Sequence, residues 1–179
     1  LTMPLGMLLQ AGASLGILGW GLDTAYAVLW PPFVALGLGI GMVMAASSDA
    51  IVGNAPVRDA GVAGGLQSTA LQVGGALGTS VLISLISSRV SATFGPELAS
   101  AGVPAPVADG LAEAKDAVAM GVAPVGPRLP ESLHGPVTEA AGQAFLNGVH
   151  AAVWVTACLC VAGAVASAWV LRRPVPAPE

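Results

Sequence analysis

Residues 37–56 read GLGIGMVMAASSDAIVGNAP and residues 60–81 read AGVAGGLQSTALQVGGALGTSV, and these two stretches decide the fold class of the chain. Both combine apolar residues with closely spaced glycines, and Asp49 is the one charged residue within them. A charged side chain at the centre of a bilayer costs about 3 kcal/mol on insertion scales, so long uncharged stretches are typical of membrane-spanning helices. The small residues let neighbouring helices approach closely.

The composition of the whole chain agrees with this interpretation. Of its 179 residues, 55% are hydrophobic, 9% are charged and 4% are aromatic. An ordinary soluble domain has about 25% charged residues, which is far more than this chain offers to water. We therefore expect an all-α integral membrane protein, and not a globular enzyme, a disulfide scaffold or a disordered tail.

Uncharged intervals divide the chain into four candidate spans. After an uncharged beginning, intervals of 25, 29 and 32 uncharged residues follow at residues 24–48, 60–88 and 140–171. A helix needs about 20 residues to cross roughly 30 Å of hydrocarbon. We expect transmembrane helices at about residues 2–22, 31–53, 62–88 and 149–171. Pro31 and Pro32 would occupy the first turn of the second helix, where a missing N–H is tolerated.

The segment 89–148, between the third and fourth helices, is different in composition. It holds nine of the sixteen charged residues and much of the proline. Residues 108–120 predict a short amphipathic helix with Leu111, Ala114, Val118 and Met120 on its apolar side. The segment as a whole is consistent with a projecting helical hairpin or with a mobile linker.

The basic residues predict an orientation in the membrane. Arg58 lies in the short turn after the second helix, and Arg172 and Arg173 follow the last helix. The positive-inside rule makes these regions cytoplasmic. We therefore expect cytoplasmic termini, a cytoplasmic tail at 172–179 and an external loop at 89–148.

Glycines at helical spacing predict faces for helix packing. Pairs four residues apart, such as Gly37 with Gly41, let two helices pack at short range. A dinucleotide-binding loop is a poor alternative, because GLGIG follows no predicted strand and lies within an uncharged helix. The glycines assigned to helix packing are Gly37, Gly41, Gly61, Gly65, Gly74, Gly75 and Gly78.

Polar residues within the spans are the main functional candidates, because they are costly in lipid and usually face a bundle interior or a wet cavity. Ser68 and Gln72 fit either hydrogen bonding between helices or a place on a substrate path. Asp49 fits a charge pair with Arg58 at the helix end better than a proton carrier. The candidates for a transport path are Gln67, Ser68, Gln72, Ser47, Ser48 and Asp49.

Catalytic and metal-binding patterns are absent from the sequence. His134 and His150 have no carboxylate at zinc-ligand spacing, and Cys158 and Cys160 point to different sides of one helix. We expect no enzyme activity, metal or cofactor. With six basic residues and a net charge of −4, the chain also lacks the electropositive surface that nucleic-acid binding requires.

The two opening stretches resemble helices twelve and thirteen of the fourteen-helix drug:proton antiporters of the major facilitator superfamily, the EmrB/QacA type. QVGGALG at residues 72–78 is the most specific part. A long loop before the last helix, Phe145 and Gly148 leading into that helix, and a short arginine-rich tail agree with the family plan.

The resemblance implies that the chain supplies helices eleven to fourteen of an efflux transporter in the cell membrane. Such a protein exports amphipathic or cationic compounds, or an antibiotic, by alternating access driven by protons. Its partners would be the N-terminal helices of the same polypeptide, which carry most proton-coupling carboxylates, together with lipid, substrate and protons. Leu1 already lies in an apolar stretch, so we expect a C-terminal part of a longer protein. The alternatives are a small membrane subunit that packs through its glycine faces and a non-functional fragment of a transporter gene.

Overall fold

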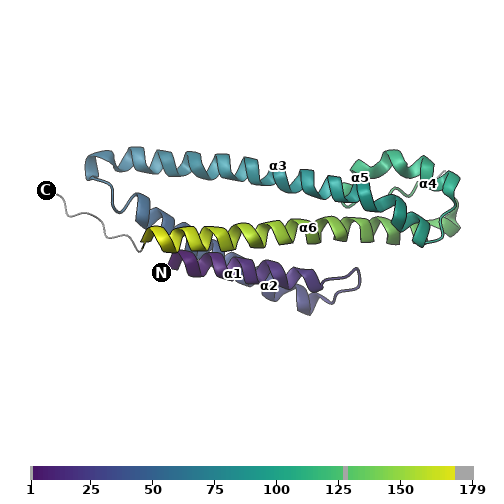
Figure 1. Cartoon of the computed structure of the whole chain (residues 1–179), viewed down its shortest axis with the longest axis horizontal. Coiled ribbons are helices and arrows are strands. Elements are labelled where there is room, and N and C mark those ends of the chain that lie inside the picture. The colour runs from purple at the N-terminus through teal and green to yellow at the C-terminus, as the bar shows by residue number, and fades with distance from the viewer. Residues whose placement is uncertain (1, 127–128, 172–179) are drawn as a thin grey trace. The chain divides into compact units, whose positions relative to one another are not determined.

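The structure is a computed structural model that describes residues 2–126 and 129–171. Its described residues form helices and turns, with no β-strand among them. Four helical segments are long and apolar enough to cross a membrane, which confirms the predicted all-α membrane class. The long helices are α1 (Thr2–Gly16), α2 (Tyr26–Ile51), α3 (Ala60–Ser100) and α6 (Glu131–Leu171) (Figure 1).

Shorter elements connect these helices. A 3₁₀ turn η1 (Ile17–Gly19) extends α1, and a second, η2 (Val57–Asp59), leads into α3. Between α3 and α6 lie α4 (Ala105–Leu111), η3 (Ala112–Ala114) and α5 (Lys115–Ala119). The predicted helix over residues 108–120 is therefore three short pieces, and its expected apolar residue Met120 is 80% exposed.

Three of the long helices extend beyond the predicted spans, whereas α1 ends at Gly16, short of the predicted end at residue 22. Helix α2 begins at Tyr26, so Pro31 and Pro32 lie inside it instead of in its first turn. Helix α3 continues to Ser100, and α6 begins at Glu131. For α3 and α6, the difference from the predicted bounds has a simple cause: a charged residue limits the part of a helix that suits hydrocarbon, but it does not end a helix in water.

The described chain forms two compact units. The first contains residues 2–20, 24–76 and 153–171, and the second contains residues 21–23 and 77–152. Helices α3 and α6 each contribute residues to both units. The two units differ in how their apolar side chains are placed.

Close backbone contact between α1 and α2 organises the first unit. A Cβ atom added at Gly39 would lie 2.6 Å from Cγ of Gln10 and 2.8 Å from the carbonyl oxygen of Gly6. One added at Gly6 would lie 2.9 Å from the carbonyl oxygen of Gly39. Side chains at either position would force the helices apart, so this crossing requires glycine on both sides.

The C-terminal part of α6 packs against α1 in the same unit. A Cβ atom at Gly163 would lie 3.1 Å from the sulfur of Met7, and the hydroxyl of Ser167 is 4.0 Å from that sulfur. Ala11 and Ser14 of α1 and Ala157 and Ala164 of α6 are buried. Small residues therefore dominate the interior of this unit, as is usual where helices pack within lipid.

The outer faces of the first unit are apolar. Leu38 and Phe33 of α2 and Leu66 of α3 are exposed, the last by 67%. Large exposed apolar surfaces of this kind are unfavourable in water and match lipid or another apolar partner.

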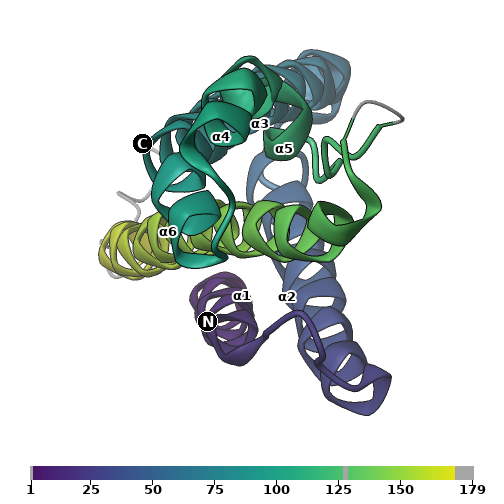
Figure 2. The same cartoon turned by 90° about the vertical axis from the view of Figure 1, so that its right-hand side faces the viewer.

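The second unit has the opposite arrangement, with a compact apolar core. Val90, Phe94 and Leu98 of α3 meet Val137 and neighbouring alanines of α6, and Val118 of α5 closes the cluster. Figures 1 and 2 show α4 and α5 beside these parts of α3 and α6. Charged residues such as Asp109, Glu113 and Asp116 lie on its surface. The segment 89–148 is thus folded around a core that α3 and α6 share, and it contains more than a two-helix hairpin.

The glycine crossing generates a first prediction. Gly39→Leu should destabilise the chain by about 1–3 kcal/mol, because the added side chain has no space between α1 and α2. Gly41→Leu is the matched control, since nothing lies within 4 Å of a Cβ atom at that position. Thermal unfolding in detergent, followed by size-exclusion chromatography with fluorescence detection, measures both. Equal losses from the two variants would contradict the proposed crossing.

A second prediction concerns the core of the second unit. Phe94 is fully buried there, so Phe94→Ala should cost about 3–5 kcal/mol. Hydrogen exchange of the backbone amides should rise in α5 and in residues 86–98 and 137–144, and remain unchanged in α1. The exposed Val122→Ala variant should leave all of these rates unchanged. A uniform increase across the whole chain after Phe94→Ala would show that the second unit has no core of its own.

Candidate functional site

Three of the predicted transport-path residues meet in the first unit. Ser47 and Ser48 lie in the last turns of α2, and Gln67 lies in the second turn of α3. The amide nitrogen Nε2 of Gln67 donates a hydrogen bond of 2.8 Å to the hydroxyl of Ser48, and a longer one of 3.5 Å to that of Ser47. The turn through residues 52–59 reverses the chain and brings these side chains together.

The hydroxyl of Ser47 is oriented by its own helix. It donates a hydrogen bond of 3.0 Å to the carbonyl oxygen of Met44, which leaves its lone pairs free to accept from Gln67. The amide group of Gln67 therefore has two hydroxyl acceptors. Its carbonyl oxygen has no hydrogen-bond donor in the part of the chain that the structure describes, and it is available to accept one from water or a ligand.

Asp49 takes a different role from the predicted one. The expected charge pair between Asp49 and Arg58 is wrong, because Arg58 instead pairs with its neighbour Asp59 at 3.3 Å. The backbone carbonyl of Asp49 accepts a long hydrogen bond of 3.4 Å from the side chain of Asn54, which also donates 3.1 Å to Ala50. Asn54 thus caps the carbonyl end of α2, where the helix leaves backbone acceptors unsatisfied.

Ser68 and Gln72 are exposed and outside this cluster. Neither has a hydrogen-bond partner within residues 2–126 and 129–171, so the interhelical bonds that the sequence allowed are not formed within this chain. Gln72 lies twelve residues after the start of α3 at Ala60. At helical rise this is about 18 Å, or roughly half of a hydrocarbon layer. Gln72 therefore requires a wet cavity or a partner helix.

The glycines that were assigned to helix packing are open in the described structure. Nothing lies within 4 Å of a Cβ atom placed at Gly37, Gly41, Gly61, Gly65, Gly74, Gly75 or Gly78. In the GLGIG stretch, the residue in close contact with α1 is Gly39, which lies on the opposite side of α2 from Gly37 and Gly41. The assigned faces remain predictions, and they require a helix that these residues do not supply.

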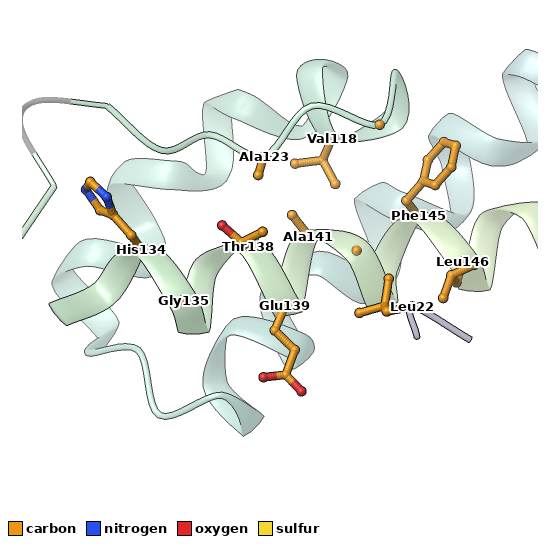
Figure 3. Close-up of a pocket in the computed structure, with 12 residues that line it drawn as sticks. Leu22, Val118, Ala123, His134, Gly135, Thr138, Glu139, Ala141, Phe145 and Leu146 are labelled. Carbon is orange, nitrogen blue, oxygen red and sulfur yellow. The ribbon is translucent and has the colours of Figure 1, made fainter. Parts of the chain in front are cut away.

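The sequence did not indicate a hollow in the second unit. This hollow has a volume of about 660 Å³ and lies between α5, the segment at residues 121–123, the first turns of α6 and Leu22 (Figure 3). His134 and Thr138 contribute polar atoms to it. Leu22 reaches it because Gly142 has no side chain, since a Cβ atom there would lie 2.8 Å from Leu22. Nothing in the periodicity of residues 2–22 connects Leu22, in the turn before α2, with residue 142.

Metal coordination finds no support in the described residues. No group of three or more histidine, cysteine, aspartate or glutamate side chains lies close enough there to hold an ion. The Gln67 cluster in the first unit offers neutral hydrogen-bonding groups.

A third prediction concerns the contact between Gln67 and Ser48. Double-mutant cycles in a membrane protein average about 0.6 kcal/mol for such bonds, and we expect a similar coupling energy between Gln67→Leu and Ser48→Ala. Unfolding free energies in bicelles for both single variants and the double variant supply the cycle. Gln72→Leu combined with Ser48→Ala is the control and should be additive. No coupling in the first cycle would show that the observed bond has no energetic effect.

Comparison with known proteins gives one informative relationship. No family model matches the chain, and no solved structure matches it. The chain is 41% identical over 166 residues to the tetracenomycin C resistance and export protein of Streptomyces glaucescens. The matched region covers 92% of this chain and 29% of the length of that protein. The chain is thus similar, over nearly its whole length, to less than a third of an export protein.

Proposed function

We propose that the chain is the C-terminal part of a proton-coupled efflux transporter of the major facilitator superfamily, of the EmrB/QacA type. The carrying observation is its 41% identity, over 92% of its length, to a protein named for resistance and export. Its substrates would be small amphipathic or cationic compounds, antibiotics among them. The protein would move them unchanged across the cell membrane, with no enzymatic step.

The polar side of α3 supports a transport path. Gln67, Ser68 and Gln72 lie on a helix whose residues 60–88 carry no charge and whose apolar side chains are exposed. Side chains of this type are retained in membrane spans where they meet water, substrate or another polar group. Neutral amides and hydroxyls can bind compounds of varied shape without an ion pair to break at each release step.

The open glycines support the proposed movement of helices during alternating access. Nothing lies within 4 Å of a Cβ atom placed at Gly61, Gly65 or Gly75. In the complete transporter, helices from the N-terminal part of the same polypeptide would pass across this surface during alternating access. Glycine allows such movement because no side chain must change its rotamer.

Proton coupling would depend mainly on residues outside this chain. Asp49 is exposed at the end of α2, and no other carboxylate lies in residues 24–88 except Asp59 in the turn. The proton carriers are therefore expected on the N-terminal helices. In the orientation that the positive-inside rule predicts, the termini and the turn at Arg58 are cytoplasmic, and residues 89–148 are external.

A fourth prediction tests this function in the full-length protein that contains the chain. Cells that express it should retain less ethidium than cells that carry an empty vector, and a protonophore should abolish the difference. Gln72→Leu should slow efflux by about two- to tenfold, which corresponds to the loss of one hydrogen bond to substrate or water. Leu77→Ala, at an exposed apolar position of the same helix, is the control.

Membrane abundance of each variant must be measured by immunoblot beside the efflux rate. Unchanged efflux in Gln72→Leu at normal abundance would remove Gln72 from the path. Absence of protonophore-sensitive efflux for ethidium, rhodamine 6G and tetracenomycin C alike would contradict export by the full-length protein.

A further inference from the structure

The hollow in the second unit has the size and lining of a small-molecule site. Its volume of about 660 Å³ lies within the range of about 300–1,000 Å³ that ligand pockets occupy. The floor consists of the buried residues Val118 and Ala141, and Phe145 forms one end wall. These side chains can cover an apolar ring system on several sides.

Two glycines contribute to the walls of the hollow. Gly121 has a φ of 79°, a conformation that side-chain-bearing residues rarely adopt, and it ends α5 directly against the ring of Phe145. Across the hollow, Leu22 fits against the backbone of α6 at Gly142. Both glycines thus line the hollow without adding a side chain to it.

Few polar groups face the hollow, and they determine what it can hold. Thr138 projects from α6 toward Ala123, while the carboxylate of Glu139 lies on the other side of the helix (Figure 3). The Thr138 hydroxyl has no hydrogen-bond partner within the described residues. Nε2 of His134 already makes a hydrogen bond of 3.0 Å with the carbonyl oxygen of Leu129.

Charge restricts the ligand further. Among the described residues, which leave out 127–128, no lysine or arginine lines the hollow, and the one formal charge that they place at its rim is the negative charge of Glu139. An anionic ligand would lose its hydration without gaining a cationic partner, which is unfavourable. A neutral molecule loses little hydration and can still use Thr138.

We propose that this hollow binds a neutral amphipathic small molecule, with an aromatic or polycyclic body against Phe145 and Val118 and a carbonyl or hydroxyl group that hydrogen-bonds to Thr138. The site is separate from the polar cluster at Gln67, and it does not depend on the transport function proposed above. It gives the charged segment 89–148 a binding role of its own.

Benzophenone is a suitable probe, because it is a neutral aromatic ketone that couples covalently to nearby C–H groups under near-ultraviolet light. The excited ketone takes the hydrogen atom, and the two resulting carbon radicals join in one C–C bond, so no further reactant is needed. The whole chain in lipid nanodiscs is irradiated with increasing benzophenone, and the labelled residues are located by mass spectrometry. We expect saturable labelling in residues 118–123 and 138–146.

Three comparisons give this experiment its controls. Thr138→Trp fills the hollow and should abolish the saturable labelling, whereas Ser132→Trp, at an exposed position in the first turn of the same helix, should leave it unchanged. Thr138→Val removes only the hydroxyl and should raise the half-saturating concentration by about two- to tenfold. The anion 4-benzoylbenzoate should label these residues poorly at equal concentration.

The result has clear opposing outcomes. Non-saturable labelling spread over the exposed apolar residues of α2 and α3, and unaffected by Thr138→Trp, would show simple partition into lipid and overturn the proposal. Equal labelling by the anion would overturn the assignment to neutral ligands. Saturation in the unaltered chain is decisive even if Thr138→Trp fails to fold. Because the chain is studied without a proton gradient, failure of export by the full-length protein would leave this result intact.

Discussion

The absence of water within the hydrocarbon of a membrane is the constraint on which the first unit depends. Every backbone polar group in such a place needs a partner within the chain, and a helix supplies it for all but the ends. The same need explains why Gln67 is turned toward Ser48 and Ser47 near the end of α2, whereas Gln72 has no partner among the described residues. The helices pack through small residues, because apolar side chains are as stable in lipid as between helices and gain little by leaving it.

The second unit follows the rule for water in the same chain. Its large apolar side chains are inside, with Phe94 and Val118 fully buried, and most of its charges are outside. Here the hydrophobic effect supplies the driving force, and burial of a side chain such as Phe94 contributes about 1.5–3 kcal/mol. Parts of one continuous chain are thus adapted to lipid and other parts to water, and the charged residues are concentrated in the part adapted to water.

The sequence predicts the class of the fold well, because uncharged length is a direct measure of compatibility with lipid. It also selects Ser47, Ser48 and Gln67 as polar side chains in such stretches; the structure joins them by hydrogen bonds, and their place on a transport path stays a prediction. It fails on the ends of α3 and α6, because charge does not stop a helix. It also misses Gly39, since the spacing of glycines in GLGIG is the same for both faces and does not indicate which face meets α1. The approach of Leu22 to Gly142 joins positions too distant for any local pattern.

The contacts of α1 also determine an order of assembly during synthesis. Its crossing with α2 at Gly6 and Gly39 can form as soon as α1 and α2 have left the ribosome and the translocon. Its contact with α6 through Met7 and Ser167 joins residues 160 positions apart and must wait until α6 has been synthesised. Packing of α6 onto α1 is therefore a later step in biogenesis than the α1–α2 crossing, and it adds a third helix to a pair that can already have formed.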